Sequence, residues 1–258
     1  MLFSEQGIIV SYQGNVKVDQ GGGNSIKKNG FWLLKPSPRW TKGQSCTNIH
    51  SGLIIVLKSV REAQMREDEI KRLLMAIEAA VEANQLETEV ASVATGIFSA
   101  LGSLGVSGEG PGEGELPVLK HLDIAIDAAE TGPAPIPELA QAFSAVSRRL
   151  RWWQRAVEEL PQFVHGHANA EIIGPGGLEV RSDVTVGVTL MAPGITYPDH
   201  RHLPAEIYVV MSEGEWRKDD GPWYEPGVGS LIYNSPNIVH AMRSGEKPLL
   251  AIWCLLSP

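Results

Sequence analysis

Residues 197–208 read YPDHRHLPAEIY, and a further histidine, His240, follows later in the chain. Within this run, the spacing H-x-H-x3-E-x-Y places four polar side chains at even-numbered positions: His200, His202, Glu206 and Tyr208. Alternate side chains of an extended strand point to the same face. Four polar groups on one face of an otherwise apolar β segment need partners, because burying them unpaired is costly.

These side chains form a ligand set for a metal. Three neutral imidazoles and one carboxylate bind a divalent transition metal ion and leave coordination positions for substrate or water. A lone core histidine is usually a hydrogen-bonded structural residue, so the prediction depends on the joint pattern. The predicted ligands of one divalent transition metal ion are His200, His202, Glu206 and His240. The mixed nitrogen and oxygen set suits Fe(II), Mn(II), Zn(II), Ni(II) or Co(II), and the sequence does not choose among them.

Composition limits the classes of protein to which the chain can belong. With 258 residues, 43% of them hydrophobic, the chain is long enough to form one hydrophobic core with additional packed helices. A net charge of −8 argues against nucleic acid or an anionic membrane as a partner. No apolar stretch approaches the ~20 residues that a membrane span needs. Cys46 and Cys254 form no disulfide framework and the start lacks a signal peptide, so we expect a cytoplasmic location.

The first 64 residues are predicted to be a poorly defined N-terminal extension. Glycine-rich and proline-rich breaks interrupt it, and short apolar runs such as residues 52–57 are candidate strands without obvious partners. Regular patterning begins at Met65, so one hypothesis is that Met65 is the true initiator.

Residues 65–159 are predicted to be a helical region. Apolar residues recur at steps of three and four from Arg66 and again over residues 136–159, which form the clearest predicted helix. Less regular helices are expected over residues 86–101 and 121–130. The glycine-rich residues 102–117 lack the spacing of a phosphate-binding loop, which favours a linker.

Over residues 160–258 the sequence pattern changes to one that predicts β-strands. Short runs rich in Val, Ile and Thr alternate with turn residues, which is typical of a sandwich or barrel. The predicted strands are residues 171–173, 184–191, 206–211, 230–234 and 249–255. The polar motif lies in the middle of this region.

Two segments carry a resemblance to a known superfamily. Residues 194–208, GITYPDHRHLPAEIY, and residues 226–240, PGVGSLIYNSPNIVH, resemble the two halves of a cupin motif. More narrowly, the run YPDHRHLPAEIYVVMSEGEWR is similar to dimethylsulfoniopropionate (DMSP) lyases of the cupin superfamily, nearest the DddL and DddQ types. The similarity extends over about residues 135–258. It implies a mainly β fold, in which a cupin double-stranded β-helix (jelly-roll) barrel over residues 160–258 holds the metal and follows an N-terminal α-helical region.

The resemblance also implies an activity. These lyases eliminate dimethyl sulfide from DMSP and leave acrylate, with a tyrosine at the position of Tyr208 as the general base and a second active-site tyrosine at that of Tyr197. This elimination suits a metal site, because a metal near the substrate carboxylate makes the adjacent C–H bond more acidic. A nearby cation also lowers the pKa of a tyrosine, which favours the phenolate.

A sulfonium substrate needs a recognition surface. An aromatic wall attracts such a cation by about 0.5–2 kcal/mol. Among the aromatic residues between the two motif halves, we predict that Tyr224 and Tyr233 bind the substrate. A second H-x-H pair, His165 and His167, has no glutamate at the right distance, so we expect it to have a structural role.

Two other classes of function stay open. The same ligands serve other metal-dependent cupin enzymes, either a sugar isomerase or a ring- or thiol-cleaving dioxygenase. A non-catalytic cupin that binds a small ligand as a sensor or store would keep the fold without turnover. In every case the expected partner is a small molecule, not nucleic acid or a membrane. The amphipathic helices permit a homodimer or pack within one chain.

Overall fold

The computed structural model describes residues 68–108, 116–157 and 159–256, together with the backbone of four short strands within residues 3–34. The chain divides into two compact units, Met1–Glu62 and Ala63–Pro258. The candidate strand at residues 52–57 and the candidate start at Met65 lie outside the described residues.

The first unit contains a small antiparallel sheet. Its strands are β1 (Phe3–Ser4), β2 (Gly7–Val10), β3 (Ser25–Lys28) and β4 (Phe31–Leu34), in the order β1-β2-β4-β3. β3 and β4 pair with Ser25 opposite Leu34 and Lys28 opposite Phe31.

The helices of the second unit come first along its chain. A helix covers residues 68–82, and the apolar stripe predicted there is buried, with Leu73 and Ile77 fully enclosed. The others are α2 (Thr88–Leu101), the 3₁₀ helix η1 (Pro117–His121), α3 (Leu122–Glu130), α4 (Ile136–Ser147) and α5 (Pro161–Gly166). None of the helices in the described part of the chain is long and apolar enough to cross a bilayer.

The single long helix predicted over residues 136–159 is wrong in its second half. α4 ends at Ser147, whose carbonyl accepts a hydrogen bond of 3.2 Å from the Trp152 indole N–H. Trp152–Trp153 then form strand β6, which pairs with strand β7. The apolar spacing predicted a helix here, but the same residues can also form an amphipathic strand. Pairing with the sheet outweighs their helical preference.

The predicted linker also holds a short strand. β5 (Val106–Ser107) lies within residues 102–117 and pairs with β8 (Glu179–Val180). Residues 109–115 lie outside the described residues.

Two facing sheets form the β part of the fold, as the cupin prediction requires. The larger has the order β13-β11-β15-β9-β7-β8-β5, with β6 also on β7, and the smaller has the order β10-β14-β12. Their remaining strands are β7 (His167–Ile173), β9 (Val184–Met191), β10 (Thr196–His200), β11 (Glu206–Val210), β12 (Glu215–Lys218), β13 (Leu231–Asn234), β14 (His240–Arg243) and β15 (Leu249–Leu256). Apart from β7 with β8, the paired strands are antiparallel.

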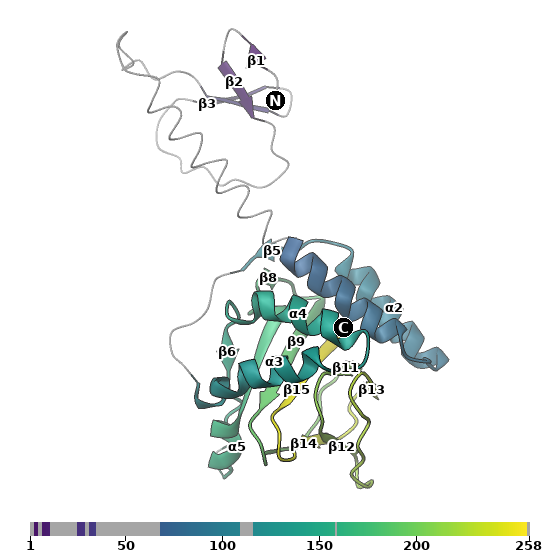
Figure 1. Cartoon of the computed structure of the whole chain (residues 1–258). Coiled ribbons are helices and arrows are strands. Elements are labelled where there is room, and N and C mark those ends of the chain that lie inside the picture. Colours follow the sequence, from purple (N-terminus) through teal and green to yellow (C-terminus); the bar gives the residue numbers. More distant parts are fainter. Residues whose placement is uncertain are drawn as a thin grey trace. The chain divides into compact units, whose positions relative to one another are not determined.

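Both faces of the larger sheet are buried. On β11, Ile207 and Val209 belong to the core shared with the helices, whereas Tyr208 and Val210 belong to a second core on the opposite face. Helices α2 and α3 contact β15 on the helical face (Figure 1). A strand that is buried on both faces shows a continuous apolar run, as β15 does.

The second core fills the space between the two sheets. The register of the smaller sheet places Tyr197 opposite Met242, and Met242 opposite Trp216. This row packs with Tyr208 and other residues of the larger sheet. The even-numbered residues of the polar motif on β11 therefore point into the interior of the sandwich.

Candidate metal centre

Three neighbouring strands and one loop supply the predicted ligands. His200 ends β10 and lies directly opposite His240, the first residue of β14. Glu206 begins β11, and His202 lies in the loop before it. A register irregularity between Tyr197 and His200 ends the regular pairing of β10 at the centre. Such bulges re-aim side chains next to functional sites.

The structure brings three of the four predicted ligands together. The candidate ligand atoms of His202, Glu206 and His240 all lie within 4.8 Å of one another. The Glu206 Oε2 atom is 3.1 Å from His202 Nε2 and 3.3 Å from His240 Nε2. Two ligands each about 2.1 Å from a metal are about 3.0 Å apart at 90° and about 3.4 Å apart at the tetrahedral angle. The observed separations therefore fit two ligands on one ion.

The backbone orients all three imidazoles in the same way. The Nδ1 atoms of His200, His202 and His240 lie 3.0, 2.9 and 3.1 Å from the carbonyl oxygens of Pro198, Pro204 and Ile238. A carbonyl only accepts, so each Nδ1 carries the proton and each neutral ring presents the Nε2 lone pair. Metal-binding histidines show this arrangement, in which a second hydrogen bond fixes the tautomer.

His240 carries the clearest sign of a missing partner. Its Nε2 atom is buried and has no hydrogen-bond partner. The Glu206 carboxylate lies 3.3 Å away, but a lone pair does not form a hydrogen bond to a carboxylate oxygen. A cation held between them would satisfy both, so the residues present fit a divalent metal ion.

The electrostatics of the cluster favour the ligand forms of Glu206 and His200. Burial raises the pKa of Glu206, but the neighbouring His202 and His240, as donors in their protonated forms, outweigh it and hold the pKa at about 2. Burial, with a smaller contribution from His240, lowers the pKa of His200 to about 4. The hydrogen bond that protonated His202 donates to Glu206 raises the pKa of His202. At neutral pH the carboxylate is therefore ionised and His200 is neutral.

His200 stands beside the three-residue cluster. Its ring centroid lies 4.1 Å from that of His240 and 6.4 Å from that of His202. It is not among the residues whose ligand atoms converge within 4.8 Å. Its role as a fourth ligand stays a prediction.

Asn234, which the sequence reasoning missed, binds the carboxylate directly. It ends β13 opposite Glu206, and its Nδ2 donates a hydrogen bond of 3.0 Å to Glu206 Oε2. The signal was a polar residue at the end of the apolar strand LIYN, two positions from the inward-facing Ile232. Only the register, which pairs β13 with β11, shows that this residue faces the glutamate.

The two predicted catalytic tyrosines lie in the interior core. Tyr208 and Tyr197 are 3% and 5% exposed and pack in the same cluster. Burial, followed by the charge of Glu206, raises the pKa of Tyr208 well above its usual value. Burial also raises the pKa of Tyr197, and this shift is opposed by Asn169, whose Nδ2 donates a hydrogen bond of 3.4 Å to its hydroxyl, and by the charge of Arg155. The protein groups alone thus keep both phenols neutral at pH 7.

The structure does not bring the two predicted substrate-binding tyrosines to this cluster. The Tyr233 side chain points to the opposite face of β13 from Asn234, and its hydroxyl donates a hydrogen bond of 2.8 Å to Glu89 of α2. The alternation of the strand explains this outcome, because Ile232 and Asn234 take the interior positions. Tyr224 bridges to Trp216 through the backbone and is 39% exposed.

Trp253 is an interior aromatic residue that the sequence reasoning missed. It lies directly opposite Tyr208 across β11 and β15, packs against the interior core, and is half-buried. Gly187 is its neighbour on β9, and a Cβ there would lie 2.2 Å from the indole ring. The glycine therefore makes room for this tryptophan beside the predicted base.

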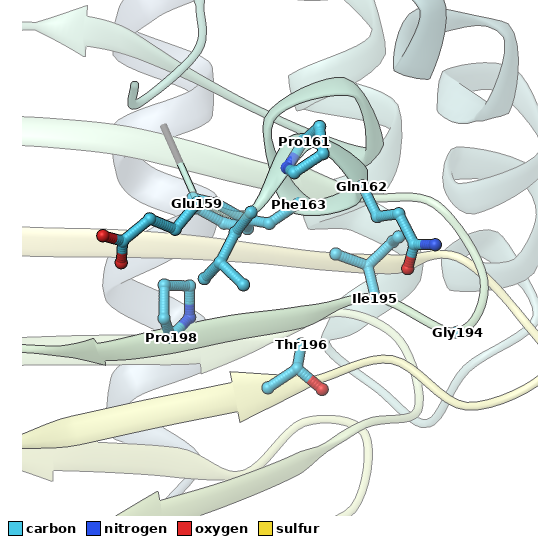
Figure 2. Close-up of a pocket in the computed structure, with 9 residues that line it drawn as sticks. Glu159, Pro161, Gln162, Phe163, Gly194, Ile195, Thr196 and Pro198 are labelled. Carbon is cyan, nitrogen blue, oxygen red and sulfur yellow. The ribbon is translucent and has the colours of Figure 1, made fainter. Parts of the chain in front are cut away.

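A separate cavity of about 440 Å³ lies outside the cluster (Figure 2). α5, the segment before it and the first half of β10 line this cavity, including Phe163, Thr196 and Pro198. None of the converging ligands lines it. Tyr197 alternates with Thr196 and Pro198 on β10 and points to the interior instead. The cavity is therefore not the metal centre.

Comparison with known proteins fits this geometry. The family model for dimethylsulfoniopropionate lyase matches residues 90–251, well over half of the chain. The chain belongs to the DMSP lyase family. It is 33% identical over 131 residues to the putative DMSP lyase DddL of Cereibacter sphaeroides, covering 50% of this chain and 54% of that protein. It is 29% identical over 82 residues to the DMSP lyase DddQ of Ruegeria pomeroyi, covering 31% and 41%. The chain spans about half the length of the curated relatives it matches.

Solved structures of the DMSP lyase family share the fold. A crystal structure described as DMSP lyases RdDddP and RnDddQII has a TM-score of 0.55 and 22% identity, covering 74% of this chain and 94% of that chain. The structure of DddQ from Ruegeria pomeroyi DSS-3 has a TM-score of 0.54 and 22% identity, covering 74% and 92%. The cupin-type fold predicted from the sequence, with its N-terminal helices, is thereby confirmed.

Proposed function

We propose that this chain is a metal-dependent DMSP lyase, which eliminates dimethyl sulfide from DMSP and leaves acrylate. The observation that carries the proposal is the convergence of His202, Glu206 and His240 beside two buried tyrosines. Membership of the DMSP lyase family supports the choice of substrate.

The metal would be held by His202, Glu206 and His240, with His200 as the fourth ligand. Four contributions from the chain, namely the carbonyls of Pro198, Pro204 and Ile238 and the amide of Asn234, hold these side chains in place. A bound divalent cation supplies Lewis acidity, which stabilises negative charge that develops next to a substrate carboxylate. Fe(II), Mn(II), Zn(II), Ni(II) and Co(II) all suit this donor set.

Tyr208 is the proposed general base. It lies two residues beyond Glu206 on the same face of β11, within the water-poor core between the sheets. As phenolate it accepts the proton from the carbon next to the carboxylate. The electron pair of that C–H bond forms the new C=C bond, the C–S bond breaks, and dimethyl sulfide leaves with the electron pair of that bond. Tyr197 is the proposed second tyrosine, held by Asn169 on the facing sheet.

Trp253 is our candidate for the surface that receives the sulfonium group. Its ring lies across from Tyr208, so a substrate whose acidic carbon reaches Tyr208 has its cationic end near an indole. Cation–π attraction is worth about 0.5–2 kcal/mol at such a surface. Tyr224, at the edge of the smaller sheet, is retained as a second candidate. Tyr233 is not, because its hydroxyl is bound to Glu89.

The proposal is tested by headspace gas chromatography for dimethyl sulfide, with purified protein loaded in parallel with Fe(II), Mn(II), Zn(II), Ni(II) and Co(II) and given DMSP. We expect metal-dependent release of dimethyl sulfide and an equal amount of acrylate. Folded, metal-loaded protein that releases none with any of these metals would overturn the lyase assignment. Consumption of oxygen would then indicate a dioxygenase, and ligand binding without turnover would indicate a sensor or store.

A further inference from the structure

Arg155 is a cation at the wall of the interior core that the proposed mechanism does not use. It follows β6, and its guanidinium carbon lies 5.9 Å from the centroid of the Tyr197 ring. The Tyr197 ring in turn lies 4.6 Å from the His200 ring. Arg155, Tyr197 and His200 thus form a continuous row that leads from the wall to the metal centre.

The backbone of Arg155 is fixed by a buried histidine. Its N–H donates a hydrogen bond of 3.0 Å to His167 Nε2, and His167 Nδ1 lies 2.6 Å from the Phe163 carbonyl. His167 is fully buried, and its ring stacks on Phe163 at 3.7 Å. This chain of contacts explains the second H-x-H pair, in which His167 is a structural residue that holds Arg155 at the interior.

The guanidinium has no counter-ion in the part of the chain that the structure describes. Its Nη1 atom is buried without a hydrogen-bond partner, and no ion pair to Arg155 occurs among the residues that the structure describes. The interior carboxylate, Glu206, is already engaged by His202, His240 and Asn234. A buried, unpaired guanidinium nitrogen is costly, and it is a strong donor to carboxylates.

We propose that Arg155 binds the carboxylate of the substrate, and of the unsaturated acid that leaves, from the side of Tyr197. This inference rests on the proposed function for the identity of the substrate, although the site itself requires only a small monocarboxylate. A carboxylate has two oxygens, so a substrate bound at the metal centre retains an acceptor for a guanidinium. Arg155 is then a substrate-binding residue that fixes which end of a zwitterion enters first.

The test compares a charged ligand with its neutral amide. Acrylate and acrylamide are titrated by calorimetry into metal-loaded wild-type protein and into Arg155→Met. A charge-assisted hydrogen bond predicts that Arg155→Met weakens acrylate binding by about ten- to hundredfold. Binding of acrylamide should change by less than about threefold. Equal affinities of wild type and Arg155→Met for acrylate would overturn the inference.

Two controls keep the result interpretable. Arg148→Met also removes a positive charge, but from an exposed residue paired with Asp123, and should leave acrylate binding unchanged. If Arg155→Met does not fold, ¹⁵N-arginine-labelled wild-type protein replaces it. Acrylate should then shift one guanidinium resonance that is absent from spectra of Arg155→Lys, and no shift would overturn the inference.

The outcome is separable from that of the lyase assignment. Arg155-dependent binding of acrylate by a protein that releases no dimethyl sulfide would keep the carboxylate site and reject the lyase. Release of dimethyl sulfide with the same KM in wild type and Arg155→Met would keep the lyase and reject the site.

Discussion

Asn234 Nδ2 donates a hydrogen bond of 3.0 Å to Glu206 Oε2, the same oxygen that faces His202 and His240. The amide therefore fixes the carboxylate oxygen that faces both imidazoles. β13 and β11 supply the two residues as a directly opposed pair, so the register of the sheet sets this contact.

Replacing this amide should loosen the metal centre without removing a ligand. We expect Asn234→Ala to weaken metal affinity by about 10- to 100-fold, as is typical when the partner of a ligand is lost. Competition with a chelator of known affinity measures the change. Tyr233→Phe is the matched control, because Tyr233 is next to Asn234 in the strand but its side chain points to the helical face and bonds to Glu89. Equal losses in the two variants would argue against a specific role for Asn234.

Tyr208→Phe separates proton transfer from metal binding. The variant keeps the ring that fills the interior and loses only the hydroxyl, so metal content should stay at the wild-type level. Loss of a general base lowers kcat by about 10²–10⁴-fold. The readings are metal content by mass spectrometry and the rate of dimethyl sulfide release. Near-full activity of Tyr208→Phe would reject its assignment as the base.

The aromatic face of Trp253 should affect substrate affinity more than chemistry. We expect Trp253→Leu to raise KM for DMSP by about 2- to 30-fold, which corresponds to the loss of about 0.5–2 kcal/mol of cation–π attraction. Trp253→Phe retains an aromatic face, so its KM should lie between those of the wild type and Trp253→Leu. Steady-state kinetics of the three proteins make the comparison. An unchanged KM in Trp253→Leu would indicate that the sulfonium group binds to another surface.

His167 should make stability depend on pH. Burial, the largest cause, lowers its pKa below the ordinary 6.5, so the unfolded chain binds the proton more readily than the folded one. The stability that this residue contributes is therefore present above pH 6.5 and is lost as pH falls toward the lower folded pKa, by up to about 1.4 kcal/mol per pH unit. Urea unfolding of chelator-treated protein between pH 7.5 and 5 should show a smaller decline for His167→Gln than for wild type. His165→Gln removes the exposed member of the same pair and should decline like wild type.

The sequence predicted the parts of the fold whose residues repeat regularly. The buried runs of β9, β11 and β15 fall within or next to the predicted strands, because Val-, Ile- and Leu-rich segments bounded by turns have few other stable forms. Strands β12 and β14 were missed, since polar and charged residues interrupt them. Their β form depends on pairing between distant segments, which local patterns do not record. The single strand expected through His200, His202, Glu206 and Tyr208 is wrong, because a loop that contains His202 separates β10 from β11.

In the candidate site, too, the sequence predicted the residues with a regular spacing and missed those that only the sheet register brings together. His202, Glu206 and His240 were predicted from the recognisable spacing of metal ligands, and the structure brings their side chains together. Asn234 and Trp253 were missed because nothing in the sequence marks them, and only the register places them opposite the candidate site residues Glu206 and Tyr208. Tyr233 was predicted from its proximity to the motif along the chain, whereas the alternation of the strand places its side chain on the helical face, where it bonds to Glu89.

The central claim is that the converging histidines and glutamate hold the metal that the elimination requires. The most direct test is a titration of chelator-stripped protein with each metal, with bound metal and the rate of dimethyl sulfide release measured on the same samples. We predict a rate that rises in proportion to bound metal and levels off at about one ion per chain, with neither binding nor release in His240→Ala. Undiminished release from the stripped protein, or from His240→Ala, would contradict the account.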